Sequence, residues 1–210
     1  MEPEAPGARP VARASPATDL RGMDAPVFVY ADESCLGNQF RDRARPGGAA
    51  GLLEQWRDDR WARRDLWVSE PATTNNRMAI RSGIECLSAL RRPCRVLFTS
   101  DSEYLIKGMR EWVPGWVRRG WKRKSGPVEN EDLWRRLVEA ASSHEVEWRW
   151  VRGHAGHPQN EYANHLATRA AKKQDDSRGP VPSGFEPWLA EQREKGRYQE
   201  FYEFARPEER

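Results

Sequence analysis

Two short apolar runs constrain the fold of this 210-residue chain more than any other feature. Residues 27–31 and 95–99 are rich in β-branched, aromatic and other apolar side chains. Such runs of about five residues are too short for ordinary helices and are typical of strands buried on both faces. We therefore expect both runs to be buried strands of a sheet that carries helices on its faces.

The hydrophobic patterns elsewhere in the chain predict further strands and helices around these two strands. Three strands, a helix, a strand, further helices, a strand and a final helix are expected in that order. This order predicts an α/β fold with a mixed five-stranded central sheet flanked by helices. Besides the two runs above, the predicted strands are 49–53, 65–69 and 145–151, and the predicted helices are 78–90, 102–112, 130–143 and 159–173.

Composition divides the chain into four parts. Residues 1–25 are rich in Pro, Ala and Arg and are predicted to be a disordered leader, either inert or a binding arm. Residues 26–174 carry the α/β pattern and form the predicted domain. Residues 175–184 contain Gly and Pro in linker-like proportion. The aromatic tail, 185–210, is expected to be a helix docked on its own domain, with a protein-partner motif as the alternative.

Bulk properties restrict the class of protein. The mean hydropathy of −0.92 and the 32% of charged residues fit a compact core with polar extensions. No apolar run approaches the ~18 residues of a membrane span, and no signal peptide is visible. Three cysteines without a CxxC pair favour the reducing cytoplasm, and we expect a monomer. A net charge of +3 is too small to identify a nucleic-acid partner by itself.

Two aspartates follow the buried strands. Asp32 comes directly after residues 27–31, and Asp101 follows the strand that ends at Thr99 and Ser100. Ligand sites of open α/β sheets lie at the carboxyl ends of strands, so neighbouring strands would bring both carboxylates together. Paired carboxylates hold divalent cations, and an all-oxygen site favours Mg²⁺ or Mn²⁺. The alternative is that each aspartate is an ordinary turn or capping residue.

Residues 107–124 combine positive charge with tryptophans. Cations that release counterions and aromatic rings that pack or stack are typical of a surface that contacts nucleic-acid backbones. A solvated charged face with inward tryptophans is the alternative. The residues concerned are Lys107, Arg110, Trp112, Trp116, Arg118, Arg119, Trp121, Lys122, Arg123 and Lys124.

Two further polar segments are candidates for a site. Residues 151–158 form a glycine-containing loop with His154 and His157, either of which could move a proton near neutral pH. Thr74, Asn75 and Asn76 open a predicted helix, where they suit a phosphate, a base edge or a simple helix cap.

Together these segments resemble type 1 ribonuclease H over residues 26–172. The matching motifs are Asp32 to Asn38, Thr73 to Met78, Thr99 to Tyr104, the basic stretch Trp112 to Trp134, and Gly153 to His157. The resemblance implies that four carboxylates hold two Mg²⁺ ions, which activate a water and stabilise the leaving oxygen as the RNA strand of an RNA/DNA hybrid is cut. It implies metal binding for Asp32 and Asp101, proton transfer or product release for His154, and hybrid contacts for Asn38, Thr74, Asn75, Asn76 and the basic stretch.

Two of the four carboxylate positions differ from the family pattern. Ala79 stands where the family has glutamate, and Asn164 stands where it has aspartate. A weakly bound metal is therefore expected, with Asn164 as a neutral oxygen ligand and Glu161 as the least unsuitable replacement acid. Glu33 follows Asp32 on the strand and is expected to point to the opposite face.

Three hypotheses remain open for the two replacements. The chain is a ribonuclease with a weakened or rearranged site, a pseudoenzyme that binds hybrids without cutting them, or a substrate-trapping variant inactivated in the laboratory at Ala79 and Asn164. A fourth hypothesis, from a different class, is an interaction module that uses the fold as a platform and the aromatic tail as its contact.

Overall fold

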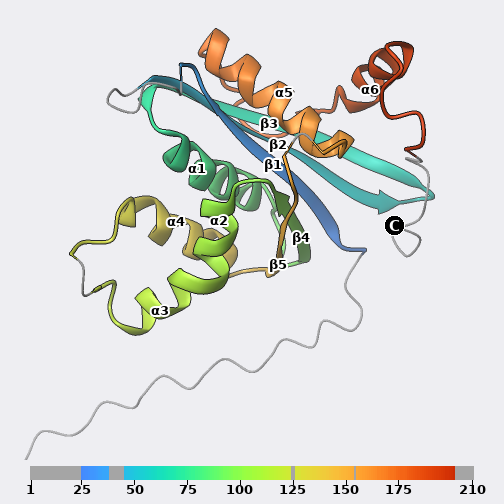
Figure 1. Ribbon diagram of the computed structural model, residues 1–210. Helices are drawn as coiled ribbons and strands as arrows, with labels where there is room; N and C mark the ends of the chain where they lie inside the picture. The colour runs from blue at the N-terminus through green and yellow to red at the C-terminus, as the bar shows by residue number, and fades with distance from the viewer. Residues whose placement is uncertain (1–24, 38–44, 124–125, 154, 202–210) are drawn as a thin grey trace, which may run out of the picture.

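The computed structural model describes residues 25–37, 45–123, 126–153 and 155–201, and these form one central sheet (Figure 1). The sheet has six strands in the order β5-β4-β1-β2-β3-β6. They are β1 (Val27–Cys35), β2 (Arg45–Arg57), β3 (Arg60–Thr73), β4 (Arg95–Ser100), β5 (Glu145–Trp150) and β6 (Val181–Pro182). Strands β1, β2 and β3 form an antiparallel meander, β4 runs parallel to both β1 and β5, and β6 pairs with β3.

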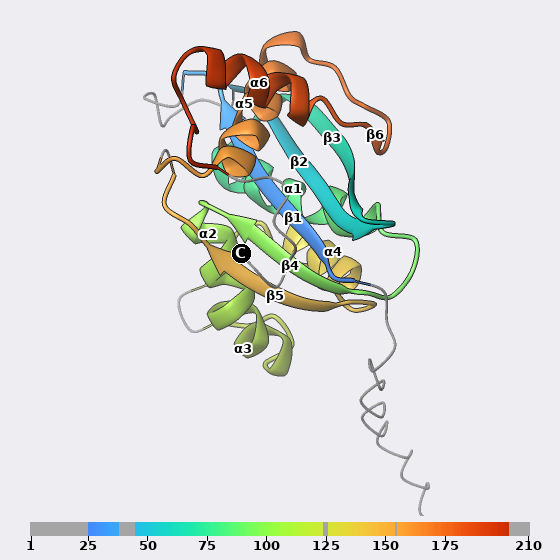
Figure 2. The same ribbon diagram turned by 90° about the vertical axis from the view of Figure 1, so that its right-hand side faces the viewer.

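Helices cover both faces of this sheet (Figures 1 and 2). On one side lie α1 (Asn75–Ser88), α2 (Glu103–Lys107), the π-helical turn η1 (Gly108–Trp112), α3 (Val113–Arg118) and α4 (Glu131–Ala141). On the other side lie α5 (Pro158–Lys173) and α6 (Phe185–Glu194). The α/β prediction is confirmed, and the two apolar runs are the neighbouring strands β1 and β4 in the middle of the sheet.

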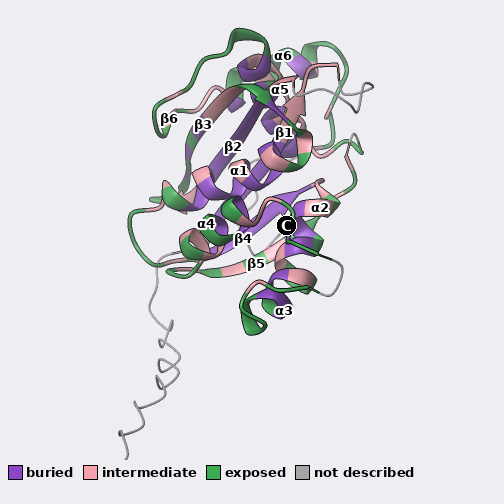
Figure 3. Cartoon of the chain, turned by 90° about the vertical axis from the view of Figure 1, so that its left-hand side faces the viewer, coloured by how far each residue is buried: buried purple, intermediate pink, exposed green. Residues whose placement is uncertain are grey.

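The alternation of side chains along the central strands supplies two cores, which Figure 3 shows as buried ribbon on either side of the sheet. Val29 and Phe98 face α1 and α4, where they pack in one cluster with the fully buried Trp134. Tyr30 and Leu52 face α5 and pack with Leu166. Because neighbouring residues of β1 serve opposite cores, the strand has to be apolar throughout.

The sheet differs from the prediction in strand number and strand length. It has six strands rather than five, and β2 begins at Arg45, four residues before the strand predicted over 49–53; Gly47 and Gly48 belong to it. A Cβ atom on Gly48 would clash with the backbone oxygen of Ala167 in α5. A Cβ atom on Gly47 would instead clash with Thr73 and Met78, so each glycine leaves room for close packing on a different face of β2.

Residues 175–184, which the composition predicts to be a linker, run along the edge of the sheet. Ser177 donates its backbone N–H to the Trp67 carbonyl at 2.9 Å, and Val181 pairs with Asp65 as part of β6. The segment is therefore an edge element along β3 that leads into α6, whose Phe185 is fully buried against α5. The predicted leader, residues 1–25, lies outside the described residues except for Ala25, as do residues 202–210 of the tail. Within the described part of the chain, no helix has the length and apolar character needed to cross a membrane.

Candidate active site

Asp32 and Asp101 meet at one edge of the sheet, as their positions after neighbouring strands predict. Strand β1 pairs in parallel with β4, and the last pair of this ladder is Tyr30 and Thr99. Asp32 and Asp101 each follow two residues later, so both lie beyond the same end of the ladder. The two aspartates line one pocket of about 430 Å³. The pocket is polar, and its lining also includes Glu33, Ser34, Cys35, Asn75, Asn76, Ser102, Glu103 and Asn164.

Glu33 is the acidic residue that the sequence reasoning missed. It does lie on the opposite strand face from Asp32, as alternation requires, but that face is the one on which α1 begins. The Nδ2 group of Asn75, the first residue of α1, donates a hydrogen bond of 2.9 Å to Glu33 Oε1. Glu33 lines the same pocket as Asp32 and Asp101, because β4 ends at Ser100 whereas β1 continues to Cys35, so that both faces of β1 border the pocket here.

Helix α1 itself contributes no acid at the position where the family pattern has one. Ala79 is fully buried in the core beneath this end of the sheet. Asn75 lies one helical turn before Ala79, so both residues face the same side of α1. Glu33 thus approaches this same face of α1 from β1.

Asp32 is held from helix α5 and from its own strand. It is 3% exposed, and its Oδ1 accepts the backbone N–H of Glu33 at 2.6 Å. The side-chain amide of Asn160 reaches its Oδ2 at 3.5 Å, and Asn164 also hydrogen-bonds to it. Glu161, the suggested replacement acid, does not line the pocket; its carboxylate lies 4.0 Å from Arg197.

The electrostatics of the three acids favour a cation. Burial, followed by repulsion from Glu33 and Asp101, raises the pKa of Asp32 well above its usual value. Burial and the Asp101 charge raise the pKa of Glu33 to about 8. Glu33 Oε2 is buried and has no hydrogen-bond donor among the residues that the structure describes. Closely spaced, poorly solvated carboxylates of this kind are stabilised by a hard divalent ion.

The donor set fits Mg²⁺ or Mn²⁺ in its chemistry. Three carboxylates and the Asn164 side-chain oxygen are hard oxygen donors, and the Oε2 atom of Glu33 is left over for a cation. Across the described residues, no three His, Cys, Asp or Glu side chains already stand close enough together to hold an ion.

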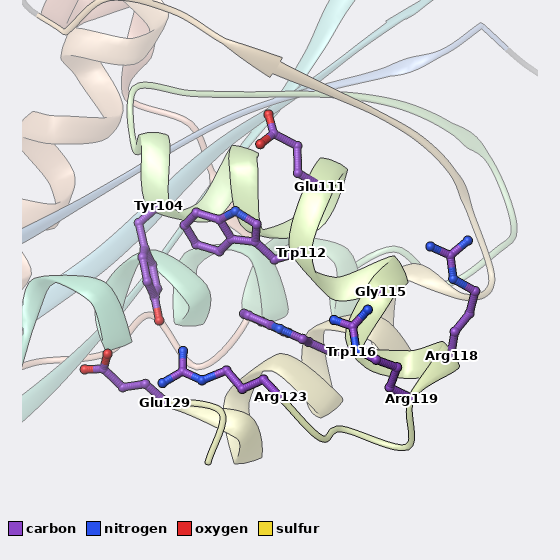
Figure 4. Close-up of a pocket in the computed structure, with 9 residues that line it drawn as sticks. All are labelled: Tyr104, Glu111, Trp112, Gly115, Trp116, Arg118, Arg119, Arg123 and Glu129. Carbon is purple, nitrogen blue, oxygen red and sulfur yellow. The ribbon is translucent and has the colours of Figure 1, made fainter. Parts of the chain in front are cut away.

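The basic stretch forms a second, separate pocket of about 530 Å³ (Figure 4). Figure 4 shows the rings of Tyr104, Trp112 and Trp116 at its centre and charged side chains around them. Trp116 packs against Trp134 and Trp121, so these tryptophans also stiffen the protrusion. The charged residues that line this pocket are Glu111, Arg118, Arg119, Arg123 and Glu129.

The remaining residues that the sequence predicts for hybrid binding lie in different parts of the structure. The Thr74 side chain caps α1 by accepting the Arg77 N–H at 3.4 Å, and Asn76 lines the acidic pocket. Lys107 pairs with Glu103 at 2.6 Å, and Lys122 is exposed near the second pocket. The guanidinium of Arg135 lies over the ring of Trp121, 4.7 Å from the ring centroid. Asn38, Lys124 and His154 lie outside the described residues.

Comparison with known proteins points to one family. A sequence model described as RNase H matches residues 24–172. The ribonuclease H of Stutzerimonas stutzeri is 46% identical over 152 residues, which are 70% of this chain and 95% of that protein. The ribonuclease H of Halorhodospira halophila is 47% identical over 153 residues, 72% of this chain and 95% of that protein.

Solved structures agree with this assignment. The crystal structure of LC9-RNase H1, described as a type 1 RNase H with the type 2 active-site motif, is 57% identical with a TM-score of 0.75, covering 80% of this chain and 82% of that one. A foamy viral protease-reverse transcriptase in complex with RNA/DNA hybrid shares the fold at 14% identity and a TM-score of 0.60, over 80% of this chain and 22% of that one. On sequence and fold alike, the chain belongs to the RNase H family.

Proposed function

We propose that this chain is a working ribonuclease that hydrolyses the RNA strand of RNA/DNA hybrids in the presence of Mg²⁺ or Mn²⁺. The observation that carries the proposal is the place of Glu33, which lines the pocket with Asp32 and Asp101. The site is then rearranged rather than depleted, because the acid absent at position 79 is supplied from β1. A 57% identical protein that is itself described by an unusual active-site motif supports this interpretation.

Asp32, Glu33, Asp101 and Asn164 would hold the metal. When bound, divalent ions in such sites supply an activated water and stabilise the leaving oxygen. Three carboxylates together with about one negative charge from the scissile phosphate balance the four positive charges of two ions. Asn164 offers a neutral oxygen, so charge balance does not require a fourth acid. His154, by resemblance to the family, is the candidate for proton transfer.

The second pocket is the surface that we assign to the nucleic-acid backbone. Arg118, Arg119 and Arg123 offer guanidinium groups to phosphates, and the neighbouring rings offer a stiff apolar wall. Asn76 lies at the mouth of the acidic pocket, where it can contact the strand to be cut. Contacts to 2′-hydroxyl groups would distinguish the RNA strand from the DNA strand.

The test is cleavage of an end-labelled RNA/DNA hybrid by the full chain and by Glu33→Gln, with Glu161→Gln as the matched control. We expect the wild type and Glu161→Gln to cut the RNA strand, whereas Glu33→Gln binds the hybrid but cuts it at least about 100-fold more slowly. Glu33→Gln with wild-type activity would refute the role of Glu33.

The same assay separates the other hypotheses. A wild-type chain that binds the hybrid tightly and salt-sensitively, yet never cuts it with Mg²⁺ or Mn²⁺, would be a pseudoenzyme. A chain without preference for the hybrid over duplex DNA would be an interaction module. Either result would overturn the proposal.

A further inference from the structure

Asp101 lies just beyond the regular sheet. The ladder between β4 and β5 ends at the pair Ser100 and Trp150, and Asp101 is the next residue along. The position of its carboxylate in the acidic pocket therefore depends on contacts that the strand ladder does not supply. The end of β5 makes three such contacts around this residue.

The first two contacts hold consecutive backbone carbonyls. The backbone N–H of Val151 donates to the Ser100 carbonyl at 3.1 Å. The indole N–H of Trp150 donates to the Asp101 carbonyl at 3.0 Å. Any residue at 151 other than proline could make the first bond, whereas the second requires a side-chain donor of the right reach at 150.

Trp150 is otherwise poorly explained by packing. Its side chain is 46% exposed, and only Val117 is comparably exposed among the large hydrophobic residues that the structure describes. Trp148, two residues earlier on the same strand, packs its ring on Phe98 with centroids 4.8 Å apart. The hydrogen bond to Asp101 therefore explains why a tryptophan stands at position 150, whereas burial does not.

The third contact is with the carboxylate itself. A Cβ atom on Gly153 would clash with Oδ2 of Asp101. The φ angle of Gly153 is not in the left-handed region, so backbone conformation does not require glycine here. The requirement is one of space, because the main chain after β5 passes directly against the carboxylate.

We infer that Trp150 and Gly153 are positioning residues for Asp101. The indole of Trp150 holds the backbone carbonyl of Asp101, and the absence of a side chain at Gly153 leaves the space that the Asp101 carboxylate occupies. The inference rests on the proposed function, in which Asp101 binds the metal. It predicts that metal affinity depends on two residues that do not themselves touch the metal.

Calorimetric titration of the full chain with Mn²⁺ tests this directly, without using cleavage as the readout. Trp150→Phe keeps an aromatic ring and removes the donor, and Gly153→Ala adds the obstructing methyl group. Each is expected to weaken Mn²⁺ binding about tenfold or more, as loss of groups that orient metal ligands typically does. Trp148→Phe, the matched control, is expected to bind Mn²⁺ as the wild type does.

The outcomes separate this inference from the proposed function. A wild-type chain that fails to bind Mn²⁺ would overturn both. Wild-type binding together with equally tight binding by Trp150→Phe or Gly153→Ala would overturn the role of that residue only. Thermal unfolding is measured in parallel, and equal losses of affinity and stability in Trp150→Phe and Trp148→Phe would indicate mere packing and refute positioning.

Discussion

The side-chain amide of Asn75 donates a hydrogen bond of 2.9 Å to Glu33 Oε1, joining the first turn of α1 to the end of β1. This bond orients the carboxylate that, in the proposed function, takes the place of the acid expected on α1. It also occupies the amide group of a residue that sequence resemblance assigns to substrate contact. Asn75 therefore has a role within the protein that does not depend on nucleic acid.

Replacing Asn75 with alanine should lower kcat. Glu33 would lose its neutral donor, and we expect kcat with Mg²⁺ to fall about tenfold, as for other groups that orient metal ligands. Steady-state cleavage of a short hybrid measures the effect, with Asn76→Ala as the control on the same helix turn. A raised KM with unchanged kcat would mean that Asn75 acts on substrate alone.

Restoring the family's glutamate at position 79 should harm the wild-type background. Ala79 is fully buried, so a larger charged side chain overpacks the core and adds a fourth acid, lowering the free energy of unfolding by about 1–3 kcal/mol. In the Glu33→Gln background, the same change should recover part of the lost cleavage. Urea unfolding and the hybrid assay measure the two effects.

A double variant, Ala79→Glu with Asn164→Asp, tests whether Ala79 and Asn164 are laboratory changes. If they were, Ala79→Glu with Asn164→Asp would raise cleavage strongly while Glu33 stays in place. We expect no such rise, because Glu33 already supplies the acid.

The metal-free protein should lose stability as pH rises. Burial and mutual repulsion raise the pKa of Asp32, and they raise that of Glu33 to about 8. A raised folded-state pKa stabilises the protein below the unfolded value, about 4.5 for glutamate, and this contribution disappears as pH passes the folded value. Glu33→Gln should remove that part of the pH dependence.

The measurement is thermal unfolding in EDTA at about pH 5 and about pH 9. Glu33→Gln should match the wild type at the lower pH and exceed its melting temperature at the higher pH. Added Mg²⁺ should narrow the difference by stabilising the wild type. Identical pH profiles for the two proteins would contradict the electrostatic account of Glu33.

Most of the sheet and two of the three acids, Asp32 and Asp101, could be predicted from local patterns. Asp32 and Asp101 follow apolar runs, and parallel neighbours deliver such residues to one edge. Glu33 could not be assigned in this way, because alternation gives its face but not what borders that face. The signal that could have found it was present: Asn75 opens a helix that the fold brings against the end of β1.

The C-terminal segment escaped prediction for a different reason. Residues 175–184 resemble a linker in composition, since a strand of two residues leaves no periodic pattern. Their structure comes from contacts with distant residues, such as Ser69, whose backbone N–H donates to the carboxylate of Asp176 at 2.7 Å. Tertiary contacts of this kind are not encoded in any local window of sequence.

The docking of α6 leads to a prediction about stability. Phe185 is fully buried, and the guanidinium of Arg63 lies over its ring at 5.1 Å. Arg63 in turn pairs with the buried Glu54 and with Glu186 of α6, both at 2.6 Å. Helix α6 thus covers the ion pair between Arg63 and Glu54, which would be more exposed to water without it.

Phe185→Ala should lower the free energy of unfolding by about 3–5 kcal/mol, the usual range for a buried phenylalanine. Denaturant unfolding measures the loss, and Trp188→Ala, which removes a partly buried ring of the same helix, is expected to cost less. Mn²⁺ affinity should stay unchanged at temperatures where the variant is folded, because α6 contributes no residue to the acidic pocket. Loss of metal binding by a fully folded Phe185→Ala protein would show instead that α6 acts on the site through α5, the helix that carries Asn164.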